Sequence, residues 1–358
     1  MSWQRHLRPS LADLEIYDVP PSTAPSRMHA NECPEPWPEH VRAALGEVVH
    51  TIELNRYPDT SGRSLRKLLA DRHACDPARI VLGNGSDEVI SLLLTALSGP
   101  TLGDSEPGHL VIPWPTFVMY GHSARVLGMP VCEVPLTEAL ELDVNAMRRG
   151  LPGAAICFLA RPNNPTASLW SGEAILELIH AFPETVFVVD EAYAAYDPGC
   201  SLWDPAGPDN YVHMSTLSKV GLAALRIGYC IAPPALAHAL DKVRHPYNVS
   251  QTSITLAETV LTRFEAEQQA MIATTIANRR KLVELLGRMP DAHVFPDHGN
   301  LVLVRFPSNE RARAVQQQLA DAGVLVKDVT RVARLHGCLR ISVGTGEDLE
   351  RLASALAL

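Results

Sequence analysis

One lysine of this sequence lies among residues that favour nucleophilic chemistry. Lys219 closes the stretch Ser-Thr-Leu-Ser-Lys at the end of an apolar run, residues 212–215. Small and apolar neighbours withdraw an amine from water, which lowers its pKa and allows it to form a Schiff base. The hydroxyls of Thr216 and Ser218 and the guanidinium of Arg226 could together hold one phosphate group. Taken alone, a Ser-Lys pair is more typical of a surface turn.

A carboxylate ends a second apolar run. Asp190 follows residues 186–189, and the carboxyl end of a buried strand is where open α/β sheets bind ligands. Burying this carboxylate unpaired would cost several kcal/mol, so it needs a cation or a donor, and a protonated pyridine ring would serve. A metal ligand, a nucleotide-site acid and a helix N-cap are the alternatives. The nucleotide alternative lacks a Walker A lysine motif.

A glycine turn, residues 83–85, precedes an apolar helical pattern at residues 89–97. A strand, a glycine turn and a helix N-terminus form a phosphate-binding arrangement, because backbone N–H groups and the helix dipole face the anion. A capped turn with Ser86 or Asp87 as N-cap is an equally good interpretation. Glu88 occupies the position of the third glycine of a dinucleotide fingerprint, which disfavours a Rossmann site.

Apolar periodicity predicts the elements that position these groups. Runs that are apolar on both faces predict buried strands at residues 80–82, 110–112, 154–159, 186–189, 212–215 and 229–232. Helical patterns alternate with them, which predicts an α/β fold whose large domain has a mostly parallel sheet flanked by helices. Asn164 follows the third run, either in a simple turn or at the same edge of the sheet as the other candidates. The convergence of Lys219, Asp190, Asn164 and the glycine turn at one edge of the sheet favours a functional site.

The rest of the chain predicts two further parts. Residues 1–37 are rich in proline and are expected to form an extended arm across the surface. Residues 252–289 have the pattern of one or two long helices, and a strand-helix-strand-strand-helix pattern follows. We therefore expect an arm, a large domain over residues 38–250, and a connecting helix with a small α+β domain over residues 251–358.

Composition bounds the class of protein. At roughly 150 residues per domain, 358 residues predict about two domains. The net charge of −9 gives no overall attraction for nucleic acid or anionic membranes. Seven scattered cysteines predict reduced thiols, and 14 histidines without ligand spacing predict no metal site. No apolar run reaches the roughly 18–20 residues of a membrane span, and no signal peptide is seen, which predicts a cytoplasmic protein.

The motifs occur in an order that resembles a known family. The matching segments are residues 83–88, 115–120, 163–166, 190–193, 218–219 with Arg226, and 338–344. In this order they resemble the fold-type I pyridoxal-phosphate aminotransferases, from Asn31 to the C-terminus. Within these, residues 55–58, 323–328 and 337–344 most resemble the histidinol-phosphate aminotransferases. The sequence departs from that pattern at Ala167, where glycine is usual, and such departures leave the substrate more open than the reaction type.

The resemblance implies that the protein binds pyridoxal 5'-phosphate, and it implies a role for each residue of the binding site. Lys219 would bind the cofactor covalently and move the substrate proton, and Asp190 would pair with the pyridine nitrogen. Tyr193 and Asn164 would donate to the ring oxygen, and Phe117 would stack on the ring. The phosphate would be held by Ser86, Asp87, Thr216, Ser218 and Arg226, and by Tyr57 from a neighbouring subunit, which implies a homodimer.

The resemblance also implies the substrates, a small-molecule amino donor and a 2-oxo acid acceptor. Arg340 would bind a carboxylate, and Lys327 would join it around the phosphate ester of histidinol phosphate. Asn31 would lie near the substrate, and Tyr120 would form a wall of its pocket. The alternatives are transamination of aromatic amino acids, decarboxylation of a phosphorylated amino acid such as threonine phosphate, and a non-catalytic binding module on the same fold.

Overall fold

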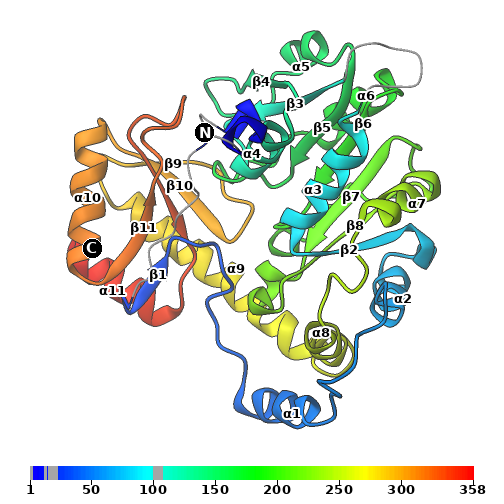
Figure 1. The fold of residues 1–358 in the computed structure, drawn as a ribbon. Coiled ribbons are helices and arrows are strands. Elements are labelled where there is room, and N and C mark those ends of the chain that lie inside the picture. Colours follow the sequence, from blue (N-terminus) through cyan, green and yellow to red (C-terminus); the bar gives the residue numbers. More distant parts are fainter. Residues whose placement is uncertain (1–2, 12–13, 15–22, 100–107) are drawn as a thin grey trace.

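A seven-stranded sheet forms the centre of the larger part of the molecule. The computed structural model describes residues 3–11, 14, 23–99 and 108–358 (Figure 1). The strand order in this sheet is β2-β8-β7-β6-β5-β3-β4. The strands are β2 (Ile80–Asn84), β3 (His109–Trp114), β4 (Val131–Pro135), β5 (Ala154–Ala160), β6 (Val186–Asp190), β7 (Tyr211–Thr216) and β8 (Ile227–Ile231). Strands β3 to β7 pair in parallel and β8 runs antiparallel to both neighbours, so the predicted mostly parallel sheet is confirmed.

Both faces of the central part of this sheet are buried because its inner strands are largely apolar on both sides. In β5, Ile156 and Phe158 belong to one hydrophobic core, whereas Cys157 and Leu159 belong to another. Successive side chains of a strand point to opposite faces, so each face needs its own layer of helices. The first face is covered by α3 (Ser86–Leu97), α4 (Val118–Leu127) and α7 (Pro234–Val243), and the second by α5 (Val144–Gly150) and α6 (Gly172–Ala181).

A second, five-stranded sheet has the order β1-β11-β12-β10-β9. Its strands are β1 (Ser26–Met28), β9 (His293–Val294), β10 (Leu301–Arg305), β11 (Val324–Asp328) and β12 (Cys338–Ser342). Apolar residues of α9 (Glu265–Gly287), α10 (Asn309–Asp321) and α11 (Gly346–Leu356) pack on it and close a separate core. The predicted strand-helix-strand-strand-helix pattern is present, and β1 and β9 are additional strands that the sequence did not indicate.

The long helical stretch after residue 250 consists of two helices. These are α8 (Gln251–Arg263) and α9, and Phe264 lies between them. Apolar residues of α8 share a core with α2 (Arg63–Arg72) and the edge of the large sheet. Figure 1 shows α9 running from α8 to the small sheet. One helix thus packs with the large sheet and the other joins the two sheets.

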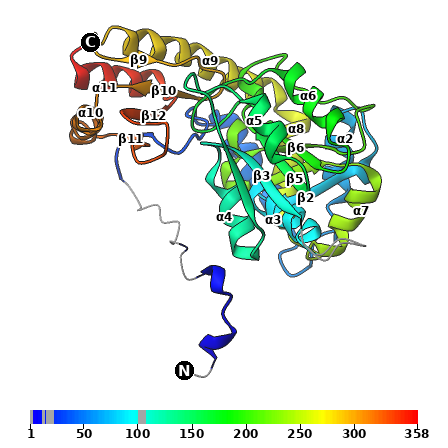
Figure 2. The same cartoon turned by 90° about the horizontal axis from the view of Figure 1, so that it is seen from above.

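The segment that precedes the large sheet contributes to both parts. Strand β1 pairs in parallel with β11, so the arm completes an edge of the small sheet instead of only crossing a surface. Residues 4–11 form two short turns, of which the second, Pro9–Leu11, lies beside the end of α4, and Arg8 donates to the carbonyl of Val126 at 3.2 Å (Figure 2). The remaining elements are α1 (Glu39–Val49) and the 3-10 turns Gln4–His6, Pro9–Leu11, Pro77–Arg79, Ala194–Tyr196, Ser218–Val220 and Ala223–Leu225.

The sequence predicts no disulfide, no metal site and no membrane span, and the structure bears on these three expectations only for the residues that it describes. All seven cysteines lie within them and are free thiols. Among the same residues there is no group of three or more metal-ligating side chains close enough to hold an ion. No described helix is both long and apolar enough to cross a lipid bilayer.

Candidate active site

A cavity of about 240 Å³ lies where the carboxyl ends of β5, β6 and β7 face the small sheet. The structure brings together every site residue predicted from the sequence except Tyr57. The cavity lining is His29, Ala30, Asn31, Ser86, Asp87, Phe117, Tyr120, Ala160, Asn164, Asp190, Ala192, Tyr193, Thr216, Ser218, Lys219, Arg226, Lys327 and Arg340. Residues from both ends of the chain therefore meet in one enclosed space.

One end of the cavity is formed by the glycine turn between β2 and α3. Gly85 is the N-cap of α3 and has a φ of +78°, a conformation that favours glycine. A Cβ atom at Gly85 would come within 2.4 Å of the Arg226 guanidinium, and the Gly85 N–H donates to the Arg226 carbonyl at 2.7 Å. Because the N-cap carries no side chain, no capping oxygen competes with an anion at Ser86 and Asp87.

Hydroxyls and a guanidinium face this helix end from the strand-end segments of β7 and β8. The Thr216 hydroxyl donates to the Ile227 carbonyl at 2.9 Å and lies 3.0 Å from the Ser218 hydroxyl. Arg226 contacts Asp87 at 3.1 Å, but both side chains are about half exposed (48% and 46%). An ion pair so open to water contributes at most about 1 kcal/mol, so a phosphate can compete for this guanidinium.

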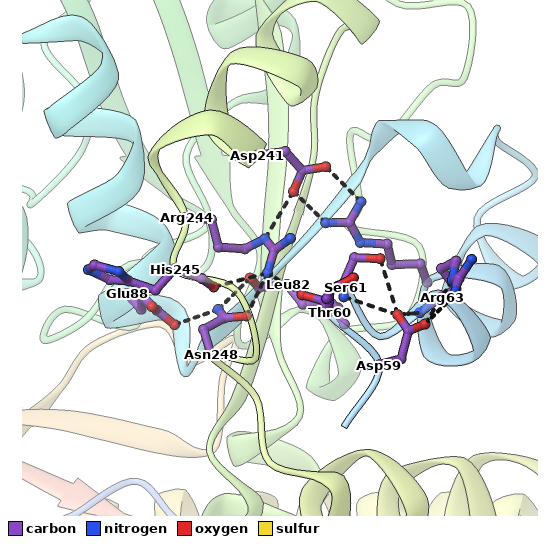
Figure 3. Close-up of polar contacts among 11 residues, drawn as sticks. Asp59, Thr60, Ser61, Arg63, Leu82, Glu88, Asp241, Arg244, His245 and Asn248 are labelled. Atoms are coloured by element: carbon purple, nitrogen blue, oxygen red, sulfur yellow. Dashed lines mark hydrogen bonds and ion pairs between the residues drawn. The ribbon is translucent and has the colours of Figure 1, made fainter. Parts of the chain in front are cut away.

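A polar network behind the turn holds it in place (Figure 3). The Glu88 carboxylate accepts from the Asn84 N–H and, at 2.8 Å, from the Asn248 side chain. The Asn248 amide also donates to the Leu82 carbonyl at 3.0 Å, and Arg244 donates to Asn248 at 3.0 Å. The Asn248 side chain thus ties both the strand before the turn and the helix after it to the segment that follows α7. The turn therefore has little freedom to move away from the cavity.

The centre of the cavity contains a buried carboxylate with two donors. Asp190 is 5% exposed and accepts from the Tyr120 hydroxyl at 2.6 Å and from the Ala192 N–H at 3.0 Å. Burial raises the pKa of Asp190, and the Tyr120 bond works against that rise. Tyr120 is fully buried and stacks on Phe158, with ring centroids 4.6 Å apart. Tyr120 lines the cavity as predicted, and its hydroxyl is committed to Asp190.

The Lys219 side chain points into the cavity while its backbone is fixed from outside. Its Nζ lies 5.8 Å from the centre of the Tyr193 ring. The Tyr196 hydroxyl donates to the Lys219 carbonyl at 2.5 Å, and the Trp37 indole donates to the Gly221 carbonyl at 2.7 Å. These bonds use main-chain groups, so they hold the lysine segment without engaging the amine.

The opposite end of the cavity is formed by the arm and the small sheet. Arg340 donates to the Asn164 side-chain oxygen at 2.7 Å and to the His29 carbonyl at a short distance. Asn31 is buried, and its amide donates to the Tyr193 hydroxyl at 3.1 Å. Asn164 thus keeps its N–H groups for a ligand, and Arg340 fixes the arm at the site.

Two residues stand apart from the sequence predictions. Tyr57 is 82% exposed and stacks on Tyr247 with ring centroids 4.8 Å apart, so its predicted phosphate contact requires a second chain and stays a prediction. His29 lines the cavity, although sequence reasoning did not select it. One histidine among 14 carries no spacing signal; only its position two residues before Asn31 could have drawn attention to it.

The lining fits a phosphorylated pyridine cofactor. Among the described residues Asp190 has one hydroxyl and one N–H as hydrogen-bond donors, so a protonated ring nitrogen would complete its pairing. Phe117, the N-cap residue of α4, lines the cavity and offers the face of its ring for stacking. The turn at Gly85, with Arg226 opposite, offers backbone and guanidinium donors for a phosphate. Lys219 provides an amine between these groups.

Comparison with known proteins agrees with this geometry. The family described as aminotransferase class I and II matches residues 27–356. The histidinol-phosphate aminotransferase of Methylibium petroleiphilum is 39% identical over 98% of this chain and 94% of its own length. Histidinol-phosphate aminotransferase 1 of Burkholderia lata is 37% identical, covering 98% and 97% of the two chains. The structure of histidinol-phosphate aminotransferase from Sinorhizobium meliloti in complex with pyridoxal-5'-phosphate shares the fold, with a TM-score of 0.83, 24% identity and coverage of 97% and 95%. This chain belongs to the aminotransferase class I and II family.

Proposed function

We propose that this protein is a pyridoxal-5'-phosphate-dependent aminotransferase that moves an amino group between L-histidinol phosphate and 2-oxoglutarate. The observation that carries the proposal is one cavity whose lining includes the Lys219 amine, the buried Asp190 carboxylate and anion-binding groups from both the Gly85 turn and the small sheet. The turn at Gly85 with Arg226 suits the cofactor phosphate, and Lys327 with Arg340 suits the anionic end of the substrate. The relatives named histidinol-phosphate aminotransferase support that substrate.

The chemistry divides between the cofactor and the chain. When bound, pyridoxal phosphate supplies an electron sink for the carbanion at the substrate α-carbon. The Lys219 amine is the group that would hold the cofactor covalently and would move the proton from the α-carbon of the amino donor. The Asp190 carboxylate would keep the ring nitrogen of the bound cofactor protonated, because a nearby negative charge favours the protonated, positively charged form of the ring. Tyr193 and Asn164 would donate to the ring oxygen of the bound cofactor and orient the ring.

The small-sheet end of the cavity sets substrate orientation. Arg340 is held by Asn164 and by the His29 carbonyl, which fixes the plane of its guanidinium. A planar guanidinium binds a carboxylate through two parallel bonds, as the α-carboxylate of glutamate requires. Lys327 adds a point charge without that planar geometry and suits a phosphate ester. Asn31 would close the site on the side of the arm.

We also propose a cytoplasmic homodimer and the division into a large domain and a small C-terminal domain. The exposed ring of Tyr57, stacked on Tyr247, supports the dimer because it offers an aromatic hydroxyl side chain outside its own cavity. In a dimer this side chain would reach the cofactor phosphate of the partner. A fully active monomer in sedimentation experiments would contradict this arrangement.

The experiment that tests the function uses purified holoenzyme and three amino donors. Histidinol phosphate, phenylalanine and threonine phosphate are each incubated with 2-oxoglutarate, and glutamate and carbon dioxide are both assayed. We expect glutamate to form fastest with histidinol phosphate. Lys219→Ala should abolish both turnover and the visible absorbance of the covalently held cofactor, whereas Lys242→Ala, an exposed lysine on α7, should change neither. Carbon dioxide release, or turnover by Lys219→Ala, would contradict the proposal.

A further inference from the structure

A row of three basic side chains crosses the small sheet where it faces the cavity. Lys327 on β11 pairs in register with Arg340 on β12. Met28 on β1 pairs with Val326 on β11, so His29 and Lys327 are the next residues along these two parallel strands. Residues directly opposed on neighbouring strands present their side chains on the same face of a sheet. In agreement, His29, Lys327 and Arg340 all line the cavity.

The groups around His29 determine its protonation state in the absence of a ligand. Burial lowers the pKa of His29, and the charges of Arg340, Lys327 and Arg27 lower it further, although Glu32 opposes them. The imidazole is therefore neutral near pH 7. Its Nδ1 is buried and has no hydrogen-bond partner within the described ranges. Such atoms are uncommon in folded proteins, and the ring that carries this one lines the cavity.

We infer that His29 is a specificity-determining residue that joins Lys327 and Arg340 in binding the phosphate ester of the amino donor, an inference that rests on the proposed function. A phosphate monoester carries nearly two negative charges near pH 7 and three acceptor oxygens. Lys327 and Arg340 balance those charges, and the imidazole adds a donor for another oxygen. The incoming dianion also favours the imidazolium, because a nearby opposite charge stabilises the charged form.

This role separates the two substrates of the reaction. The carboxylates of 2-oxoglutarate carry one charge and two oxygens each, so Arg340 alone can satisfy one of them. His29 has less to add for such a ligand. The row therefore favours the phosphorylated donor over an unphosphorylated amino alcohol while leaving the acceptor nearly unaffected.

The test compares His29→Asn with His238→Asn, the matched change of an exposed histidine on α7. Loss of one hydrogen bond to a charged group corresponds to about a tenfold loss of affinity. We expect His29→Asn to raise the KM for histidinol phosphate about tenfold with little change in kcat or in the KM for 2-oxoglutarate. His238→Asn should match the natural protein. Thermal unfolding checks that both variants fold, and His29→Gln replaces the asparagine variant if it does not.

The conservative variant His29→Lys supplies a second readout. Between pH 6.5 and 8.5 the substrate phosphate is already a dianion, since its second pKa is about 6. Over that range the natural protein should show a rising KM for histidinol phosphate, because the imidazolium that the bound dianion favours becomes harder to form as pH rises. His29→Lys carries a permanent charge and should keep a low KM that changes less with pH.

The outcomes distinguish this inference from the proposed function. An unchanged KM for histidinol phosphate in His29→Asn, with turnover by the natural protein, would overturn the role of His29 alone. If the natural protein does not use histidinol phosphate, the proposed function fails. Inorganic phosphate binding to the holoenzyme, measured by calorimetry, then decides the inference. About tenfold weaker binding in His29→Asn supports the anion site, and equal binding refutes it.

Discussion

Tyr120→Phe removes one hydroxyl from the centre of the cavity and leaves the ring in place. The deleted bond is short, 2.6 Å, and joins two buried groups, Tyr120 and Asp190. Hydrogen bonds to charged groups contribute about 1.5–3 kcal/mol, and the Ala192 N–H is the other donor to this carboxylate in the described structure. A loss of about 2 kcal/mol corresponds to roughly 30-fold weaker cofactor binding if the bond must hold Asp190 toward the ring nitrogen.

The same substitution predicts a pH-dependent loss of stability in the cofactor-free protein. Because burial raises the folded-state pKa of Asp190 above its usual value, its favourable contribution is complete below that usual value and is lost as pH rises through the raised pKa. The Tyr120 bond limits this loss because it stabilises the ionised carboxylate. Tyr120→Phe should therefore reduce the free energy of unfolding by about 2 kcal/mol at pH 8 and by less at pH 4.

Urea unfolding at both pH values and fluorescence titration with pyridoxal phosphate measure these two effects. Tyr211→Phe is the matched control, because Tyr211 is also buried but its hydroxyl has no partner among the described residues. Removing an unpartnered hydroxyl should leave stability unchanged or improve it. Equal losses at pH 8 and pH 4, or a loss in Tyr211→Phe as large as in Tyr120→Phe, would refute the reasoning.

Three further predictions concern the surrounding frame. Gly228→Ala would place a Cβ within 2.2 Å of the Ser86 nitrogen, so cofactor affinity should fall at least tenfold as the turn is displaced, and unaltered affinity would contradict the close packing. Asp241→Asn weakens the pairing of the buried Arg66, to which it makes bonds of 2.9 and 2.6 Å, and should lower the free energy of unfolding by about 2 kcal/mol in urea titrations. Burial, and then the charge of His213, lowers the pKa of His73 to about 4, so His73 is neutral in the folded protein at pH 6.5. As pH falls from 6.5 toward 4, the unfolded chain takes up a proton at His73 before the folded protein does, and the free energy of unfolding decreases. His73→Gln should make the free energy of unfolding less dependent on pH in that range.

The sequence predicts the parts of the fold that depend on burial. The runs at β5 and β6 are apolar on both faces, a pattern typical of strands buried between two helical layers. Strand β1 has three residues in a proline-rich segment, too short for periodicity to reveal. Strand β4 is partly exposed and includes Glu133, so its pattern is weak.

The site residues could be predicted from the sequence where they lie at the ends of strands. They were harder to predict where a contact depends on the direction of a side chain. Lys219 and Asp190 follow buried strands, and that position alone takes them to the cavity. The bond between Tyr120 and Asp190 depends on a rotamer in the first turn of α4, which spacing does not reveal. His29 reaches the cavity through the pairing of β1 with β11, a contact between distant segments of the chain.

The junction of arm and small sheet has a consequence for biosynthesis. Asn31 and Ser342 bond each other across 311 positions of the sequence. At roughly 5–20 residues per second, a ribosome needs about 15–60 s to synthesise the chain between these two residues. During that time the arm has no partner strand, although the segments of the large sheet have already been made. A chain that stops before β11 has no strand to receive β1 and cannot place Asn31 at the cavity. The arm can therefore take its place at the cavity only after the chain has been made as far as Ser342.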